Sequence, residues 1–76
     1  MEGLTDAMRE LETGDTITIN THNQTLTVTD TMFDGEMIEL EGPRGGEKSL
    51  IENVNTGDVT VMENNNKVGM LTEINV

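Results

Sequence analysis

The 76-residue chain lacks cysteine, tryptophan and tyrosine, and it has one phenylalanine, one histidine and one serine. Without cysteine it cannot form a disulfide scaffold, a cysteine-ligated zinc site or a thiol enzyme centre. A transmembrane helix needs about 20 consecutive apolar residues, whereas no apolar run here exceeds three. Residues 1–6 show neither the basic start nor the apolar stretch of a signal peptide. These absences predict a small soluble protein of the cytoplasm with no membrane partner.

Basic residues are also scarce. Fifteen acidic residues stand against four basic ones, giving a net charge of −11, and the chain has two lysines but 12 threonines. Because the Debye length is only about 3 Å at 1 M salt, concentrated salt screens the repulsion among these acids. The composition is similar to that of haloarchaeal cytoplasmic proteins, which fold in molar salt. The stretch from Leu40 to Val76, which begins with the letters LEGPRGG, resembles small uncharacterised haloarchaeal proteins, and that resemblance carries no known site to transfer.

An amphipathic helix is predicted within residues 1–13. Its apolar side chains recur at i, i+4 and i+7, and they are Leu4, Met8 and Leu11. Thr5 or Asp6 is expected to cap its start. About two helical turns are unstable alone, so we expect the helix to dock on the rest of the chain.

From residue 15 the apolar period changes to two, which predicts strands. We expect residues 16–19 and 25–29 to form a hairpin around a two-residue turn at His22 and Asn23, with Ile19 opposite Leu26 and Ile17 opposite Val28. Asn and His both tolerate the positive φ that such a turn needs.

A second hairpin is expected around residues 33–35, with Val28 opposite Leu40 and Gly35 at a G1-bulge position. A two-residue loop would instead bring Glu41 to the core face. The third strand is then expected from Glu36 to Glu41.

The rest of the chain continues as short strands. Residues 42–46 form a predicted loop, and residues 48–54 fit either a strand or a single helical turn, because two apolar residues are adjacent there. A last hairpin is expected around residues 64–66. In this hairpin we expect Val61 to lie opposite Val68 and Val59 opposite Met70. A bulge is expected near Gly69, after which Ile74 and Val76 face inward again.

These elements predict one domain over residues 1–76, mainly β, in which residues 15–76 form a small barrel of five or six antiparallel strands. Such a short sheet has to curl and close its edges, with the helix covering one end. The pattern is similar to SH3-like barrels and, as the alternative, to OB-like barrels. The helix precedes the first strand, whereas an OB-fold carries its helix between strands three and four, so the SH3-like arrangement is favoured.

The sequence gives little support to enzyme chemistry or to a cofactor. His22 is expected at the tip of a turn, and Ser49 has no histidine close to it in this layout, so a Ser–His pair is not predicted. The segment from Asp30 to Glu41 matches a calcium-loop motif except that Met32 occupies a position that needs an oxygen ligand. The residues on both sides of this segment are also predicted to be strands, whereas an EF-hand calcium loop lies between two helices. We therefore predict a non-enzymatic protein without a metal site.

Two binding surfaces remain, and we keep both. An adaptable apolar face could be formed by Met32, Met37 and Met62, and it would mark a protein partner. The alternative is a nucleic-acid contact. Its candidate residues are Arg44, Gly45, Gly46, Lys48 and Lys67. The chain has no set of aromatic stacking residues, so a protein-binding module is the first hypothesis and a nucleic-acid-associated barrel is the second.

Overall fold

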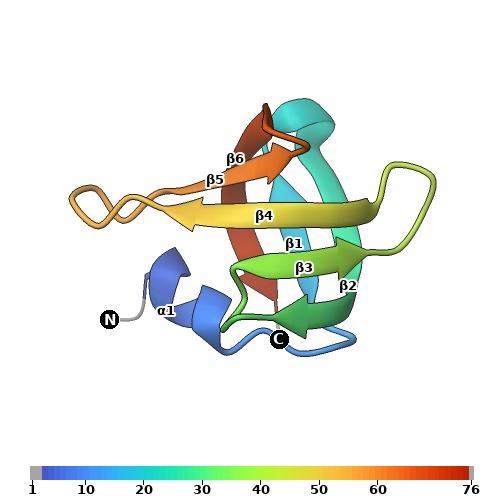
Figure 1. Cartoon of the computed structure of the whole chain (residues 1–76), viewed down its shortest axis with the longest axis horizontal. Coiled ribbons are helices and arrows are strands. Elements are labelled where there is room, and N and C mark those ends of the chain that lie inside the picture. Colours follow the sequence, from blue (N-terminus) through green and yellow to red (C-terminus); the bar gives the residue numbers. More distant parts are fainter. Residues whose placement is uncertain (1–2, 76) are drawn as a thin grey trace.

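Six antiparallel strands close into a barrel in the computed structural model, which describes residues 3–75 (Figure 1). The elements in chain order are α1 (Leu4–Arg9), β1 (Thr16–Ile19), a 3₁₀ turn (Thr21–Asn23), β2 (Gln24–Met32), β3 (Met37–Leu40), β4 (Gly46–Glu52), β5 (Val59–Glu63) and β6 (Asn66–Asn75). The prediction of a mainly β chain, with a small antiparallel barrel and one short helix near the N-terminus, is confirmed.

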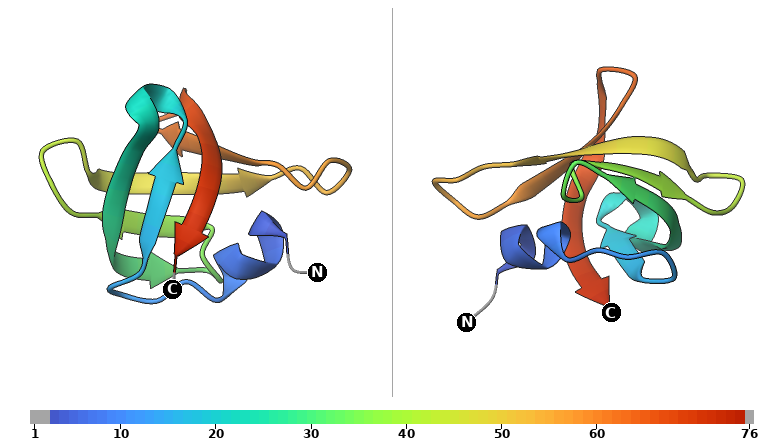
Figure 2. Two further views of the ribbon diagram at one scale, coloured as in Figure 1. Left: turned by 180° about the vertical axis from the view of Figure 1, so that it is seen from behind. Right: turned by 60° about the horizontal axis from the view of Figure 1, so that its bottom comes forward.

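The strands form a meander. Each strand pairs with the next, and β6 pairs back with β1. Figure 2 shows β1, β2 and β6 on one side of the barrel and β3, β4 and β5 crossing them on the other. Strand β6 belongs to both sides, because its first half pairs with β5 and its second half pairs with β1.

The core lies between these two layers and contains no aromatic side chain. Its buried apolar residues are Met8, Leu11, Ile17, Ile19, Val28, Ile38, Leu40, Leu50, Val59, Val61 and Leu71. Strand residues alternate between this core and the outer face, as β-strand geometry requires. Aliphatic residues at alternate positions are therefore sufficient to fill a barrel of this size.

The helix covers one end of the barrel, as predicted. Met8 and Leu11 are buried in the core cluster, and Leu4 packs against it. Gly35 in the β2–β3 turn allows this close approach, because a Cβ atom on it would overlap the backbone carbonyl of Met8. The predicted cap was wrong: Gly3 occupies the N-cap position and no side chain caps the helix. The helix ends at Arg9, so Leu11 reaches the core from the segment that follows it.

The first hairpin has a different register from the predicted one. Ile17 lies opposite Leu26 and Ile19 opposite Gln24, which leaves a connection of four residues instead of two. A shift of two residues keeps every side chain on the same face, so the apolar pattern could not detect it. The extra residues contact β6: the Asn20 amide donates to the Met70 carbonyl (2.9 Å), and the Met70 amide donates to Asn20 Oδ1 (2.9 Å).

The second hairpin confirms the pairing of Val28 with Leu40, but its loop has four residues instead of three, because Met32 pairs with Met37. A bulge between Val28 and Asp30 absorbs the additional residue. The sequence predicted a bulge at Gly35, and this prediction was wrong, because the bulge lies between Val28 and Asp30. Strand β3 is accordingly shorter than predicted, and Asp30 lies opposite Glu39.

The C-terminal half settles one open alternative and corrects one register. Residues 46–52 form strand β4, so the predicted segment over 48–54 is strand as far as Glu52 and not a helical turn, and residues 53 and 54 begin the connection to β5. Strand β5 has the predicted bounds. Val61 lies opposite Gly69 and not Val68, because the register shifts by one residue between Val61 and Met62. Met70 accordingly lies opposite Thr60 and not Val59. The predicted inward position of Val76 lies outside the described residues.

Candidate functional site

The three methionines predicted to form a binding face lie in one line across four strands. Met32 is opposite Met37, Met37 is opposite Ser49, and Ser49 is opposite Met62. We call these four residues the methionine row. The sequence distributes them over β2, β3, β4 and β5, and the strand register brings them together.

The methionine row faces outward. Its strand neighbours Ile38 and Val61 are buried in the core, and alternation therefore directs Met37 and Met62 to the outer face. Met32 is 46% exposed, and Met37 and Met62 are half-buried. An unbranched thioether side chain adapts its shape to different partners, so this row is a flexible apolar surface.

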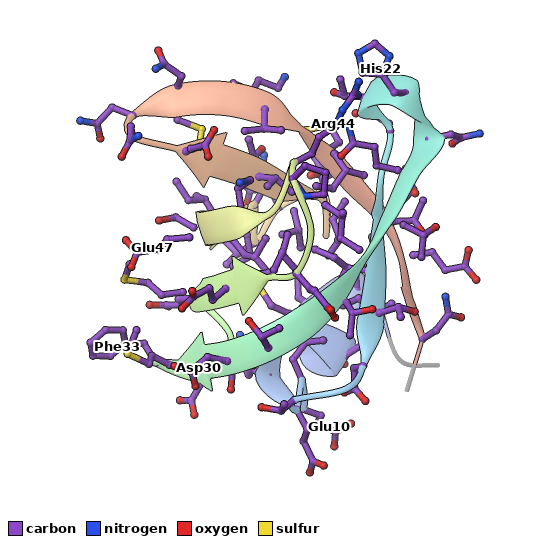
Figure 3. All side chains as sticks on the ribbon, turned by 90° about the vertical axis from the view of Figure 1, so that its right-hand side faces the viewer. Glu10, His22, Asp30, Phe33, Arg44 and Glu47 are labelled. Carbon is purple, nitrogen blue, oxygen red and sulfur yellow. The ribbon has the colours of Figure 1, made fainter. Side chains whose placement is uncertain are left out.

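Further apolar side chains extend this surface. Phe33, in the turn directly after Met32, is 68% exposed and points away from the barrel (Figure 3). A second outward line runs through Ile51, Thr60 and Met70, which are paired across β4, β5 and β6. Sequence reasoning assigned Phe33 only to a loop. The signal it passed over was that the one aromatic residue of the chain falls in a predicted turn. In the structure its φ is 54°, a value that bulky residues rarely adopt.

A shallow groove of about 390 Å³ adjoins the methionine row. It runs along β4 beside the start of β3, and its lining residues are Glu36, Met37, Ser49, Leu50, Ile51 and Glu52. The groove thus connects the methionine row to the exposed Ile51.

Three carboxylates form a second line directly beside the methionine row. Asp30 lies opposite Glu39, and Glu39 lies opposite Glu47. We call these three residues the acidic row. All three are exposed, and Figure 3 shows Asp30 and Glu47 on the same side of the barrel as Phe33. In the part of the chain that the structure describes, the ion pairs use other acids, namely Asp6, Glu52 and Glu63.

The predicted nucleic-acid residues do not form one cationic surface. Lys48 is only 3% exposed, and its Nζ donates to Glu63 Oε1 (2.9 Å) and to the Gly45 carbonyl (2.8 Å). Gly45 closes the β3–β4 loop through a backbone hydrogen bond, and Gly46 is the first residue of β4.

Arg44 and Lys67 are the exposed cations of that set. Arg44 lies in the β3–β4 loop, beside a groove of about 220 Å³ that also includes Gln24 and Leu26. Lys67 lies in β6, opposite Met62.

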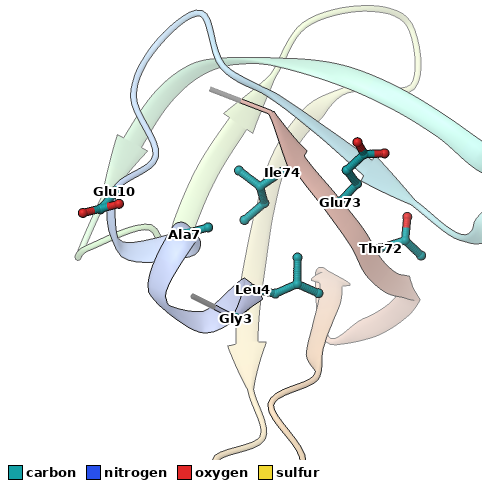
Figure 4. Close-up of a pocket in the computed structure, with 7 residues that line it drawn as sticks. All are labelled: Gly3, Leu4, Ala7, Glu10, Thr72, Glu73 and Ile74. Carbon is teal, nitrogen blue, oxygen red and sulfur yellow. The ribbon is translucent and has the colours of Figure 1, made fainter. Parts of the chain in front are cut away.

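A third groove, of about 480 Å³, lies between α1 and the second half of β6 (Figure 4). Its lining residues are Gly3, Leu4, Ala7, Glu10, Thr72, Glu73 and Ile74. Its polar side chains are Glu10, Thr72 and Glu73, and Leu4, Ala7 and Ile74 make the rest of its lining apolar.

The residues considered for chemistry are separated from one another. His22 is exposed in the 3₁₀ turn at one end of the barrel (Figure 3), whereas Ser49 lies within the methionine row. In the calcium-like segment, the Glu41 amide donates to the Thr27 carbonyl (2.8 Å), which places Glu41 beside Thr27 and away from the turn that holds Asp34. Within residues 3–75 no group of three or more His, Asp or Glu side chains could hold a metal ion.

Comparison with protein-family models, with curated proteins and with solved structures gives no match to this chain. The described residues include no helix that is long and apolar enough to cross a membrane. Assignment of a function therefore depends on the surfaces described above.

Proposed function

We propose that this chain is a non-enzymatic binding module that binds a protein through the methionine row. The observation that carries the proposal is the cross-strand alignment of Met32, Met37 and Met62 on the outer face of the barrel. Contiguous exposed apolar side chains are characteristic of protein-interaction surfaces, and methionine adapts to the shape of a partner.

The architecture suits such a role. The single helix precedes β1, and β3 and β4 are joined by a short loop without a helix. This order of elements supports an SH3-like barrel over an OB-like one. The separation of His22 from Ser49 supports a role without catalysis, because an activated nucleophile needs its base within hydrogen-bond reach.

Life in concentrated salt is part of the proposal. The acidic row places like charges directly opposite each other on neighbouring strands, an arrangement that destabilises a sheet in dilute buffer. Molar salt screens this repulsion. The cytoplasm of a salt-accumulating haloarchaeon is the setting that fits both the acidic row and the net charge of −11.

A nucleic-acid partner is the second candidate, and the exposed Arg44 beside its small groove is the observation that favours it. Such a partner would use Arg44 and Lys67, since Lys48 already pairs with Glu63. The phosphates of a nucleic acid would have to approach a strongly acidic molecule. A protein partner is therefore the better supported of the two candidates.

Methyl NMR of the six methionines tests the proposal. The protein, labelled with ¹³C in its methionine methyl groups and with ¹⁵N in its amides, is titrated in molar KCl with protein fractions of a cell extract and, separately, with oligonucleotides. We expect the protein fractions to shift or broaden the methyl signals of Met32, Met37 and Met62, while the buried Met8 stays unchanged and serves as the internal control. Oligonucleotide-induced shifts of the Arg44 and Lys67 amides, with silent methionines, would contradict the proposal.

A pair of variants provides the matched control. Met37→Thr combined with Met62→Thr removes two members of the methionine row with a residue that is favourable in strands. Val54→Thr removes an 82% exposed apolar side chain from the β4–β5 connection. The first variant should abolish the binding seen in the extract titration and the second should leave it unchanged. Equal effects of the two variants would contradict the assignment of the surface.

A further inference from the structure

We infer that the partner of the methionine row is a cationic amphipathic segment, whose apolar side chains lie on the methionine row and whose lysine or arginine side chains pair with the acidic row. This inference rests on the proposed function and names the chemistry of the partner. It follows from the position, the spacing and the missing counter-charge of the acidic row.

The two rows are adjacent outward positions of the same strands. On β2 the outward positions are Asp30 and Met32, and on β3 they are Glu39 and Met37. Successive outward residues of a strand lie about 7 Å apart, twice the rise of about 3.3 Å per residue. A partner that contacts both rows therefore needs apolar and basic side chains at about this separation. An extended segment has that spacing when residues i and i+2, which share a face, are one apolar and one basic, with a small polar residue between them.

The acidic row lacks a counter-charge in the part of the chain described by the structure. Neighbouring strands lie about 4.8 Å apart, and the Debye length is about 3 Å in 1 M salt, so Asp30, Glu39 and Glu47 repel one another more strongly as the salt concentration falls. The ion pairs of Arg9 and Lys48 are made with other acids. A partner that brings cations to this row would relieve the repulsion in addition to forming new ion pairs.

Two further carboxylates lie in the groove on the other side of Met37, and one of them is already paired. Glu36 and Glu52 line this groove, and Glu52 is paired with Arg9 at 2.8 Å. The next outward positions beyond Ser49 and Met62 are Ile51 and Thr60, so the acidic row is the charged border of the apolar surface. A segment with apolar and basic side chains on one face matches this arrangement in charge as well as in polarity.

Other occupants fit the surface less well. A second copy of the chain would bring the same acidic row against this one. A nucleic acid would bring phosphates to it. A metal ion would not serve as the counter-charge, because no cluster among residues 3–75 gathers three ligating groups.

Three synthetic peptides of nine residues provide the probes. The first repeats Leu-Ser-Lys-Ser, so that leucine and lysine alternate on one face of an extended chain. The second has glutamate in place of lysine, and the third has serine in place of leucine. Each is titrated into the full chain with methyl-labelled methionine, in the lowest KCl concentration that keeps the barrel folded. We expect saturable shifts at Met32, Met37 and Met62 with the leucine–lysine peptide, affinity about tenfold lower with serine–lysine, and no binding with leucine–glutamate.

Two charge-matched variants locate the basic contact. Glu39→Gln combined with Glu47→Gln should weaken the leucine–lysine peptide about tenfold, as expected for the loss of two exposed ion pairs. Glu12→Gln combined with Glu73→Gln removes the same charge away from the row and should change affinity less than about twofold, because distant exposed charges are screened.

The outcomes separate this inference from the proposed function. Binding of the extract protein together with no binding of the leucine–lysine peptide, or equal effects of the two double variants, would overturn the inference and leave the protein-binding role intact. If neither extract protein nor peptide shifts the methionine methyls, both are overturned. Self-association through the methionine row, detected by sedimentation, would overturn the inference in favour of a second copy.

Discussion

Replacement of Gly35 by alanine should loosen the helix from the barrel, and its cost can be worked out from the structure. Gly35 has φ of +85°, and an added Cβ would overlap the Met8 carbonyl. Gly57 has nearly the same φ, +80°, with no atom within 4 Å of an added Cβ. An alanine at positive φ costs about 1–2 kcal/mol at either position. At Gly35 the helix must also shift, and exposing Met8 adds about 1.5–3 kcal/mol.

We therefore expect Gly35→Ala to lower the free energy of unfolding by about 2.5–5 kcal/mol and Gly57→Ala to lower it by about 1–2 kcal/mol. The assay is urea unfolding in molar KCl followed by far-UV circular dichroism, since the chain has no tryptophan or tyrosine for fluorescence. The difference between the two variants isolates the contact with the helix. Equal losses would refute the conclusion that Met8 closes this end of the barrel against the β2–β3 turn.

Three further predictions concern charge. The midpoint of thermal unfolding should rise strongly from dilute buffer to molar KCl, because salt screens the repulsion among 15 acids; equal midpoints would contradict the expectation of a salt-adapted protein. Lys48→Met should lower the free energy of unfolding by about 1–3 kcal/mol, because it leaves the Gly45 carbonyl without its donor. Lys67→Met, at an exposed position, should change it by less than about 0.5 kcal/mol. Calcium in molar KCl should not shift the Asp34 and Gly35 amides, and a chelator-sensitive shift that saturates at one equivalent would disprove this.

The sequence predicted the element types well, because the apolar period is unambiguous in most of the chain. Alternation identified β1, β2, β5 and the start of β6, and the i, i+4, i+7 spacing identified the helix that carries Met8. The ambiguous segment was β4, where Leu50 and Ile51 are adjacent. Leu50 is buried, whereas Ile51 is 54% exposed on the outer face. Because an apolar residue occupies an outward position, the alternation of apolar and polar residues that marks a strand is not visible in this part of the sequence.

Strand registers were harder to predict because contacts distant in sequence decide them. The first hairpin gained two residues in its turn so that Asn20 can exchange hydrogen bonds with Met70. Thr21 Oγ1 also donates to the Val68 carbonyl (2.6 Å). Both contacts join the start of the barrel to its last strand, 50 residues away in the case of Asn20 and Met70. Local turn propensity contains no information about them.

The candidate site was likewise predictable in its residue types but not in its strand registers. Sequence reasoning named Met32, Met37 and Met62 from residue type and their position relative to the inward set. Their alignment in one row depends on three strand pairings and on the bulge after Val28, which sequence alone did not locate. The acidic row likewise became visible only when the structure placed Glu39 between Asp30 and Glu47.

Photo-crosslinking through methionine tests the central claim most directly. Photo-methionine is incorporated into the full chain in cells grown in molar salt. The cells are then irradiated, and the crosslinked residues are assigned by mass spectrometry. The account predicts crosslinks from Met32, Met37 and Met62 to one protein, through a segment that carries apolar and basic residues, with Met8 crosslinked only within the chain. Crosslinks of the methionine row to nucleic acid or to a second copy of the chain, or the absence of any intermolecular crosslink from these three residues, would contradict it.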